Sequence, residues 1–212
     1  MKNHKTEIAL VVGHYPHSGA DGEWEWNKKC GEYMQQRLEG LGFKVYLHIH
    51  AIRGYGARQD AMREAVKDNL PHCEAVIELH YNDADSEQAH GHEFLYNATP
   101  KLAECLQGSF KKSFPESTAR DGGTKQRSTG DGAGFLIKAP AASCIVEPFF
   151  RHNAQEWEQF SEAWQKVGET YIAGICDYTS ISYEQDQPQE DDLTLESLDA
   201  RVKELERILK PR

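Results

Sequence analysis

The chain has 212 residues and a mass of 24.0 kDa, which allows one well-buried core with a small appendage. Its formal net charge of −10 argues against non-specific binding to nucleic acid or to an anionic membrane surface, because its field repels both. The five cysteines are widely spaced and include no C-x-x-C pair, so we expect no disulfide framework and a reducing compartment of synthesis.

The start of the sequence bears on where the protein is made. Residues 1–5 lead straight into a strand-like segment, without the apolar region and cleavage site of a secretory signal peptide. No apolar run is long enough to cross a bilayer. We therefore expect cytoplasmic synthesis without membrane insertion, and release by a separate route if the protein acts outside the cell.

Short apolar segments alternate with amphipathic ones, which predicts an α/β fold with a single twisted, mostly parallel or mixed central sheet flanked by helices. In chain order, the pattern predicts a strand at 8–12, a helix at 24–41, a strand at 43–49, a helix at 57–69, strands at 75–80 and 93–96, and a helix that begins at Thr99-Pro100. Residues 115–134 are expected to form a flexible loop, followed by strands at 135–137 and 143–146. Asn153 then resembles a helix start, before a core-facing apolar stripe at 157–175.

The end of the chain differs in composition from the main domain predicted at residues 1–180. Residues 181–192 are acidic and polar, which is typical of a linker. Residues 193–212 are predicted to form a short coiled-coil-like helix, because apolar residues recur there with heptad spacing: Leu195, Leu198, Val202, Leu205 and Leu209. Self-association of this helix into a homo-oligomer and its folding back onto the main domain both remain open.

Polar side chains follow three of the predicted strands at the point where each strand ends. His14 comes after the first, His80 ends another, and Glu147 ends the last. Open α/β sheets bind ligands at this edge, and Glu23 at the start of the first helix can reach it. Two histidines and one glutamate around an open fourth position form a catalytic zinc set, and a further carboxylate can transfer protons. The spacing alone leaves the alternative that both histidines are hydrogen-bonded loop residues.

The order of the motifs resembles the zinc-dependent N-acetylmuramoyl-L-alanine amidases of amidase type 3, over about residues 7–176. The motifs are Gly13-His14, Glu23, Leu79-His80-Tyr81-Asn82, GHEFLY from Gly91 and VEPFF from Val146. The resemblance implies a phosphorylase/hydrolase-like fold and a peptidoglycan substrate. It also implies that a single Zn²⁺ is held by His14, Glu23 and His80, and that Glu147 is the general base. The bond cleaved would join the lactyl group of N-acetylmuramic acid to L-alanine of the stem peptide.

Two alternative ligands lie close to these positions. Glu25 is the fallback for Glu23, which is preferred because Asn27 follows it at the family's four-residue offset. His17 stands where the family has a glycine-rich sequence, and it ranks below His14 as a ligand.

Four further residues are assigned by analogy with the family. Asn82, Arg127 and Arg63 are expected to contact substrate, although the two arginines are otherwise ordinary solvated side chains. Glu78 replaces a small or hydroxyl residue of the family and shares a strand face with His80. It is either an outer partner of a ligand histidine or an unpaired acid that changes the properties of the metal.

Without an export signal or a wall-binding repeat, a phage or prophage endolysin released through a holin is the expected setting. Two other classes stay open. The first is another zinc amidohydrolase or carboxypeptidase that acts on a small amide. The second is a non-catalytic wall-binding or assembly protein whose working part is the heptad segment.

Overall fold

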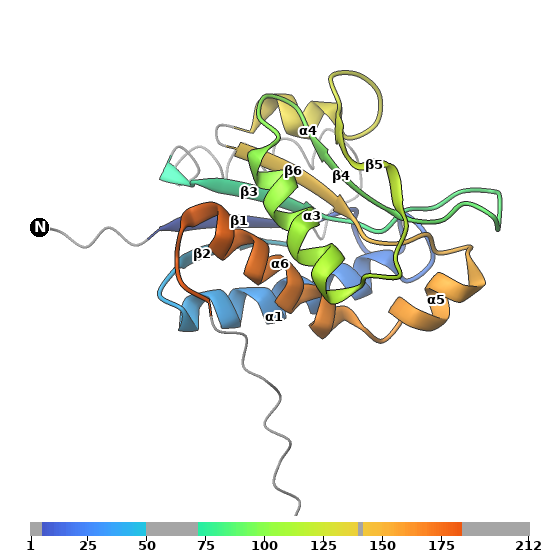
Figure 1. Ribbon diagram of the computed structural model, residues 1–212, viewed down its shortest axis with the longest axis horizontal. Coiled ribbons are helices and arrows are strands. Elements are labelled where there is room, and N and C mark those ends of the chain that lie inside the picture. Colours follow the sequence, from blue (N-terminus) through green and yellow to red (C-terminus); the bar gives the residue numbers. More distant parts are fainter. Residues whose placement is uncertain (1–5, 50–71, 140–141, 184–212) are drawn as a thin grey trace, which may run out of the picture.

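The computed structural model describes residues 6–49, 72–139 and 142–183, and it contains a six-stranded mixed sheet with helices packed against both faces (Figure 1). The strands are β1 (Glu7–Val12), β2 (Lys44–His48), β3 (Ala75–Leu79), β4 (His92–Tyr96), β5 (Ala119–Gln126) and β6 (Ala142–Glu147). Their order in the sheet is β2-β1-β3-β6-β4-β5. The first four are parallel, β4 runs antiparallel to β6, and β5 pairs in parallel with β4.

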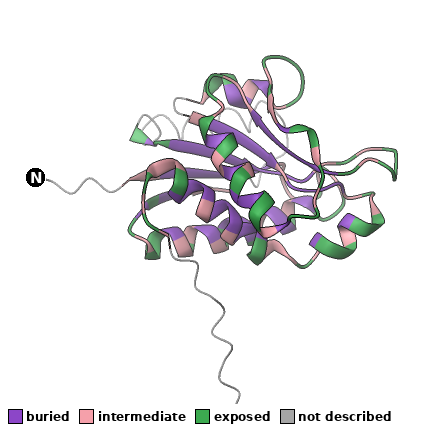
Figure 2. Cartoon of the chain, in the orientation of Figure 1, coloured by how far each residue is buried: buried purple, intermediate pink, exposed green. Residues whose placement is uncertain are grey.

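The helices divide unequally between the two faces of the sheet. The described helices are α1 (Glu23–Gly40), α3 (Lys101–Ser113), α4 (Ala133–Lys138), α5 (Ala154–Phe160) and α6 (Trp164–Thr179). The apolar faces of α1, α3 and α6 bury the larger core against the sheet, whereas α4 covers a smaller cluster on the opposite face. Strands β1, β3, β4 and β6 are mostly buried, whereas β2 and β5 at the two edges of the sheet are partly exposed (Figure 2). The predicted α/β class with a mixed sheet is therefore confirmed.

Two predicted elements around residues 115–138 are wrong. The expected loop contains the edge strand β5, whose sequence ARDGGTKQ has almost no apolar side chains because most of its residues are exposed. The expected strand at 135–137 is helix α4, which begins after Gly132 in a left-handed conformation (φ 78°). Its buried side chains Phe135 and Leu136 are adjacent in sequence, so no helical period is visible over so short an element.

The predicted helix start at Asn153 is confirmed, because its side chain accepts a hydrogen bond from the backbone N–H of Glu156. The single apolar stripe at 157–175 in fact covers two helices, α5 and α6, separated by a turn. The helix predicted at 57–69 with Arg63, most of the linker, and the heptad helix at 193–212 all lie outside the described residues. Within the part of the chain that is described, no helix is long and apolar enough to span a membrane.

His92 is a titratable group in the larger core. Its ring lies between β4 and α3, with ring centroids 4.9 Å from Phe110 and 5.9 Å from Phe94, and its Nδ1 is 2.9 Å from the Ser117 hydroxyl. The residue is fully buried. Burial, helped by the charge of Lys111, lowers the pKa of His92 from its ordinary value of 6.5 to about 4.

We expect His92 to make the fold acid-sensitive. Between pH 6.5 and about 4 the unfolded chain binds a proton at His92 that the folded protein does not, so stability falls as pH falls through this window. The His92→Phe variant should remove most of this loss, which amounts to about 2 kcal/mol between pH 7 and pH 4.5. Urea unfolding at pH 7 and at pH 4.5 measures the change in the free energy of unfolding for each variant. His90→Gln, at an exposed position, is the control, and an unchanged pH dependence in His92→Phe would contradict the expectation.

Candidate functional site

The carboxyl ends of β1, β3 and β6 open into one cleft of about 960 Å³. The register of the three strands sets this arrangement, because Leu79 pairs with Val12 on one side and with Val146 on the other. The residues that directly follow these positions therefore lie at the same level of the sheet edge. His14, Glu23, His80 and Glu147, which the sequence places far apart, all line this cleft.

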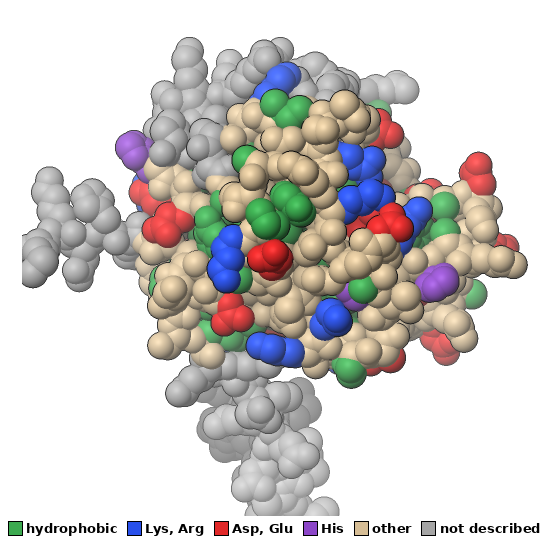
Figure 3. Space-filling view, turned by 45° about the horizontal axis from the view of Figure 1, so that its top comes forward, with side chains coloured by type: hydrophobic (Ala, Val, Ile, Leu, Met, Phe, Trp, Pro, Cys, Tyr) green, Lys and Arg blue, Asp and Glu red, His purple; other side chains and the backbone are tan. Residues whose placement is uncertain are grey.

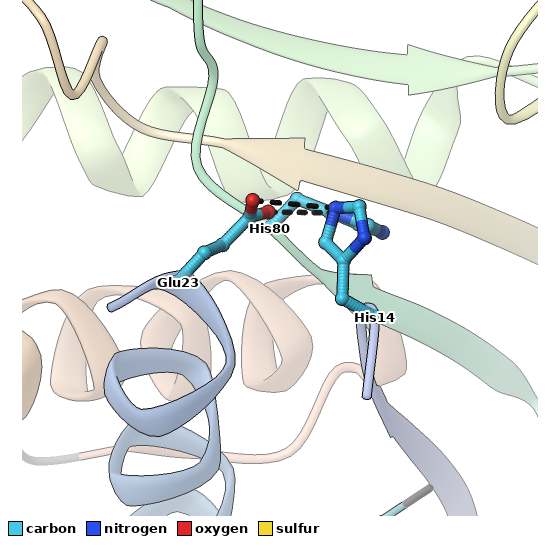
Figure 4. Close-up of side chains that lie close together, drawn as sticks. All are labelled: His14, Glu23 and His80. Atoms are coloured by element: carbon cyan, nitrogen blue, oxygen red, sulfur yellow. Dashed lines mark hydrogen bonds and ion pairs between the residues drawn. The ribbon is translucent and has the colours of Figure 1, made fainter. Parts of the chain in front are cut away.

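Three of these side chains form one compact cluster (Figure 4). The Nε2 atom of His14 lies 3.2 Å from one carboxylate oxygen of Glu23, and the Nδ1 atom of His80 lies 2.9 Å from the other. The two imidazole rings meet edge to face at 4.8 Å between centroids. One potential ligand atom from each residue can be chosen so that all lie within 4.8 Å of one another.

The Glu23 carboxylate is buried at the amino end of α1 and is held by donors on every side. The backbone N–H groups of Ala20 and Tyr81 donate to it at 2.9 and 3.2 Å, in addition to its contacts with the two histidines. Burial alone would raise the pKa of Glu23, but the hydrogen bonds and charges of His14 and His80 outweigh it and hold the pKa at about 2. Glu23 is therefore ionised at any physiological pH.

Two glycines make room for this cluster. A Cβ atom on Gly13 would lie 2.3 Å from Cε1 and 2.4 Å from Nε2 of His80. A Cβ atom on Gly19 would lie 2.5 Å from the Glu23 carboxylate and 2.6 Å from the His14 ring. His14 itself has a left-handed backbone (φ 62°), a conformation that side chains other than glycine adopt at a cost. The loop from 13 to 22 is thus shaped around the three polar side chains.

The donor set fits a divalent metal ion. Histidine nitrogen and carboxylate oxygen bind zinc at about 2.0–2.2 Å, so neighbouring donors in a tetrahedral set lie roughly 3.3 Å apart. The distances of 3.2 and 2.9 Å, each from a different oxygen of Glu23 to one ring, are close to this value, and one ligand atom from each of the three residues lies within 4.8 Å of the others. A set of two imidazoles and one carboxylate leaves a fourth position toward the cleft for water or substrate.

Glu147, at the end of β6, differs from Glu23 in its electrostatic surroundings. Burial raises the pKa of Glu147 to about 7, and the negative charges of Glu93 and Glu23 act in the same direction. The positive charges of His80 and Arg127 oppose this rise. A carboxyl group with a pKa near neutrality can both accept and return a proton at working pH, as a general base requires.

The far wall of the cleft carries a polar network that the sequence did not predict. The Asn82 amide donates to Glu93 at 2.7 Å, and Arg120 and Lys125 lie 3.6 and 4.0 Å from the same carboxylate. On the face shown in Figure 3, basic and acidic side chains gather side by side. Arg127 also lines the cleft, and its buried Nε has no hydrogen-bond partner within the described segments.

The remaining predicted residues lie in different places. Glu25 and His17 are exposed, and neither belongs to the cluster. Glu78 is fully buried, with a carboxylate oxygen 3.4 Å from Nε2 of His80. Glu93 belongs to the GHEFLY motif and was therefore within reach of sequence reasoning. Arg120 and Lys125 were not, because they belong to the unpredicted strand β5.

This arrangement, with two imidazoles, one ionised carboxylate and a second carboxyl group of near-neutral pKa at the edge of an α/β sheet, is what a metal-dependent hydrolase requires. The family model of N-acetylmuramoyl-L-alanine amidases matches residues 8–177. The chain belongs to this family, amidase type 3, whose members hydrolyse peptidoglycan. The predicted family is therefore confirmed.

Several solved structures of amidases have a similar fold. The CwlD amidase of Clostridioides difficile, solved in complex with the GerS lipoprotein, is 18% identical with a TM-score of 0.72, over 84% of this chain and 100% of that one. AmiC2 of Nostoc punctiforme is 19% identical with a TM-score of 0.68, over 84% and 98%. The catalytic domain of the CD27L endolysin, which targets Clostridia difficile, is 18% identical with a TM-score of 0.65, over 81% and 97%. No curated protein matches the chain significantly in sequence.

We expect Gly13→Ala to disrupt the site because the added methyl group would overlap the His80 ring. Overpacking of this kind costs about 1–3 kcal/mol of folding free energy, and the displaced ring should weaken binding of Zn²⁺. Denaturant unfolding and zinc titration measure the two effects. Gly108→Ala, in an exposed helical position with no atom within 4 Å of the new Cβ, is the matched control and should be neutral or stabilising. Zinc binding equal to that of the wild type in Gly13→Ala would contradict this account.

Proposed function

We propose that the protein is a zinc-dependent N-acetylmuramoyl-L-alanine amidase that cleaves the amide between the lactyl group and L-alanine of peptidoglycan. In this proposal His14, Glu23 and His80 hold one Zn²⁺ and Glu147 is the general base. The observation that supports it best is that the three ligand atoms cluster in the same cleft that Glu147 lines. Bound there, Zn²⁺ supplies the positive charge that polarises a carbonyl group and acidifies water.

Glu147 carries the proton through the reaction. Its carboxylate takes the proton from the attacking water and then returns it to the nitrogen of the departing amine, which leaves as the free amino group of L-alanine. Without the metal ion, the raised pKa of Glu147, about 7, keeps both of its protonation states accessible near neutral pH, and the charge of a bound Zn²⁺ would favour the carboxylate. The cation of Arg127 stabilises the ionised form that starts this cycle.

The substrate-binding roles of Asn82 and Arg127 are part of the same proposal. The side-chain N–H of Asn82 donates to Glu93, and its amide oxygen accepts a hydrogen bond from the N–H of Asp83. The second lone pair of that oxygen is available to a substrate in the cleft. Arg127 is a half-buried guanidinium in the cleft wall, placed to contact a carbonyl or carboxylate of the peptide stem. Release through a holin and the endolysin setting stay predictions, as does self-association through the heptad segment.

The Glu147→Ala variant tests the assigned base. We expect its kcat to fall by about 100- to 10,000-fold, the usual contribution of a general base, with zinc binding retained. Purified peptidoglycan is digested, and new L-alanine amino groups and new reducing sugar ends are counted. The wild type should free amino groups only, which separates this reaction from glycan cleavage and from action on small amides. Glu104→Ala, at an exposed position on α3, is the control; full activity in Glu147→Ala would reject the assigned base.

Arg127 should contribute to the position of the acidic limb of the pH profile. Because its charge lowers the pKa of Glu147, Arg127→Met should raise that pKa and shift the acidic limb of kcat/KM to higher pH. Arg127→Lys retains a positive charge and should leave the limb close to that of the wild type. Hydrolysis rates from pH 5 to 9 provide the measurement, and a limb that does not move in Arg127→Met would rule out this coupling.

A further inference from the structure

Glu78 is a buried acid that the catalytic scheme above does not use. It is the fourth residue of β3, two positions before His80, and its side chain is fully buried. Its register partners on the neighbouring strands are Val11 and Ile145, both apolar and buried. A carboxylate in such surroundings is costly unless it is paired, so its presence in the middle of a sheet calls for a compensating interaction.

Beneath the cleft, the Glu78 carboxylate contacts the edge of the His80 ring that faces away from Glu23. One carboxylate oxygen of Glu78 lies 3.4 Å from Nε2 of His80, whereas Nδ1 of the same ring lies 2.9 Å from Glu23. The backbone of Gly13 closes the space beside Cε1 and Nε2. The two ring nitrogens of His80 thus face two different carboxylates, one inside the metal cluster and one outside it.

This arrangement distinguishes the two tautomers of His80. An imidazole that binds a metal through one nitrogen carries its proton on the other nitrogen, and an acceptor beside that proton fixes the ring orientation. In the zinc-loaded protein Glu78 can act as such an acceptor for a proton on Nε2, which leaves Nδ1, the nitrogen that faces Glu23, to bind the metal. Without the metal, the same Nδ1 is the atom that donates to Glu23.

We propose that Glu78 is a positioning residue that fixes His80 in the Nε2–H form and thereby strengthens metal binding through Nδ1. The proposal rests on the zinc site of the proposed function. It extends that function, because it assigns the ligating nitrogen of His80 and names a residue outside the ligand set on which the affinity for zinc depends.

The test compares Glu78→Gln and Glu78→Leu with the wild type. Gln keeps an oxygen that can accept from Nε2–H but loses the charge, whereas Leu loses both. We expect zinc affinity, measured by competition with a chromogenic chelator, to fall in the order wild type, Gln, Leu, by about 10- to 100-fold overall. The ¹⁵N shifts of His80 in the zinc-loaded wild type should show a protonated Nε2 and a ligated Nδ1.

The stability of the metal-free protein distinguishes the proposed positioning role of Glu78 from a purely structural role. Replacing a buried acid by Leu should leave the melting temperature equal or higher, while zinc affinity falls. Ser143→Ala, a buried polar residue on β6 that donates to the Leu136 carbonyl, is the control and should bind zinc normally. Equal zinc affinity in all Glu78 variants, ligation of His80 through Nε2, or parallel losses of stability and affinity would each overturn the proposal.

These measurements use Zn²⁺ without peptidoglycan, so they are independent of turnover. If zinc affinity follows the expected order but no L-alanine amino group is released from peptidoglycan, the proposed function fails and the role of Glu78 stands. If the wild type binds no zinc, both fail.

Discussion

The buried charge of Glu23 is the constraint on which the rest of the site depends. An ionised carboxylate removed from water costs several kcal/mol unless charges and hydrogen bonds replace its hydration. Here the replacement comes from the rings of His14 and His80 and from the N–H groups of Ala20 and Tyr81. The donors come from the loop after β1 and from the end of β3, so the position of α1 relative to the sheet is tied to this one side chain.

The register of the sheet is the second constraint, because it aligns the carboxyl ends of the strands that carry the site. Backbone hydrogen bonds extend the pairing just beyond the strands, from Gly13 N–H to the Leu79 carbonyl and from His80 N–H to the Val146 carbonyl. A shift of one residue in either pairing would turn His80 toward the opposite face and separate it from Glu23. The parallel core β1-β3-β6 therefore determines the geometry of the cleft as directly as the polar side chains do.

These two conditions explain how much of the structure could be predicted from the sequence. The parallel strands are buried and apolar and end abruptly in a polar residue, so both the strands and the convergence of His14, His80 and Glu147 were predictable. Strand β5 is polar because most of its side chains are exposed, and nothing in its sequence separates it from a loop. The wall formed by Arg120 and Lys125 was missed for this reason, since their contacts with Glu93 exist only once β5 is paired with β4.

The same sheet edge gives two carboxyl groups opposite properties. Glu23 is surrounded by hydrogen-bond donors, and its pKa is held at about 2. Glu147 lies among desolvating neighbours and other acids, and its pKa rises to about 7. Identical side chains are thereby suited to different tasks, one to remain an anion that can hold a cation and the other to exchange a proton. The two pKa values differ because backbone N–H groups and imidazoles reach the carboxylate of Glu23 but not that of Glu147 in the same number. The ends of β1 and β3 and the start of α1 set the positions of those donors.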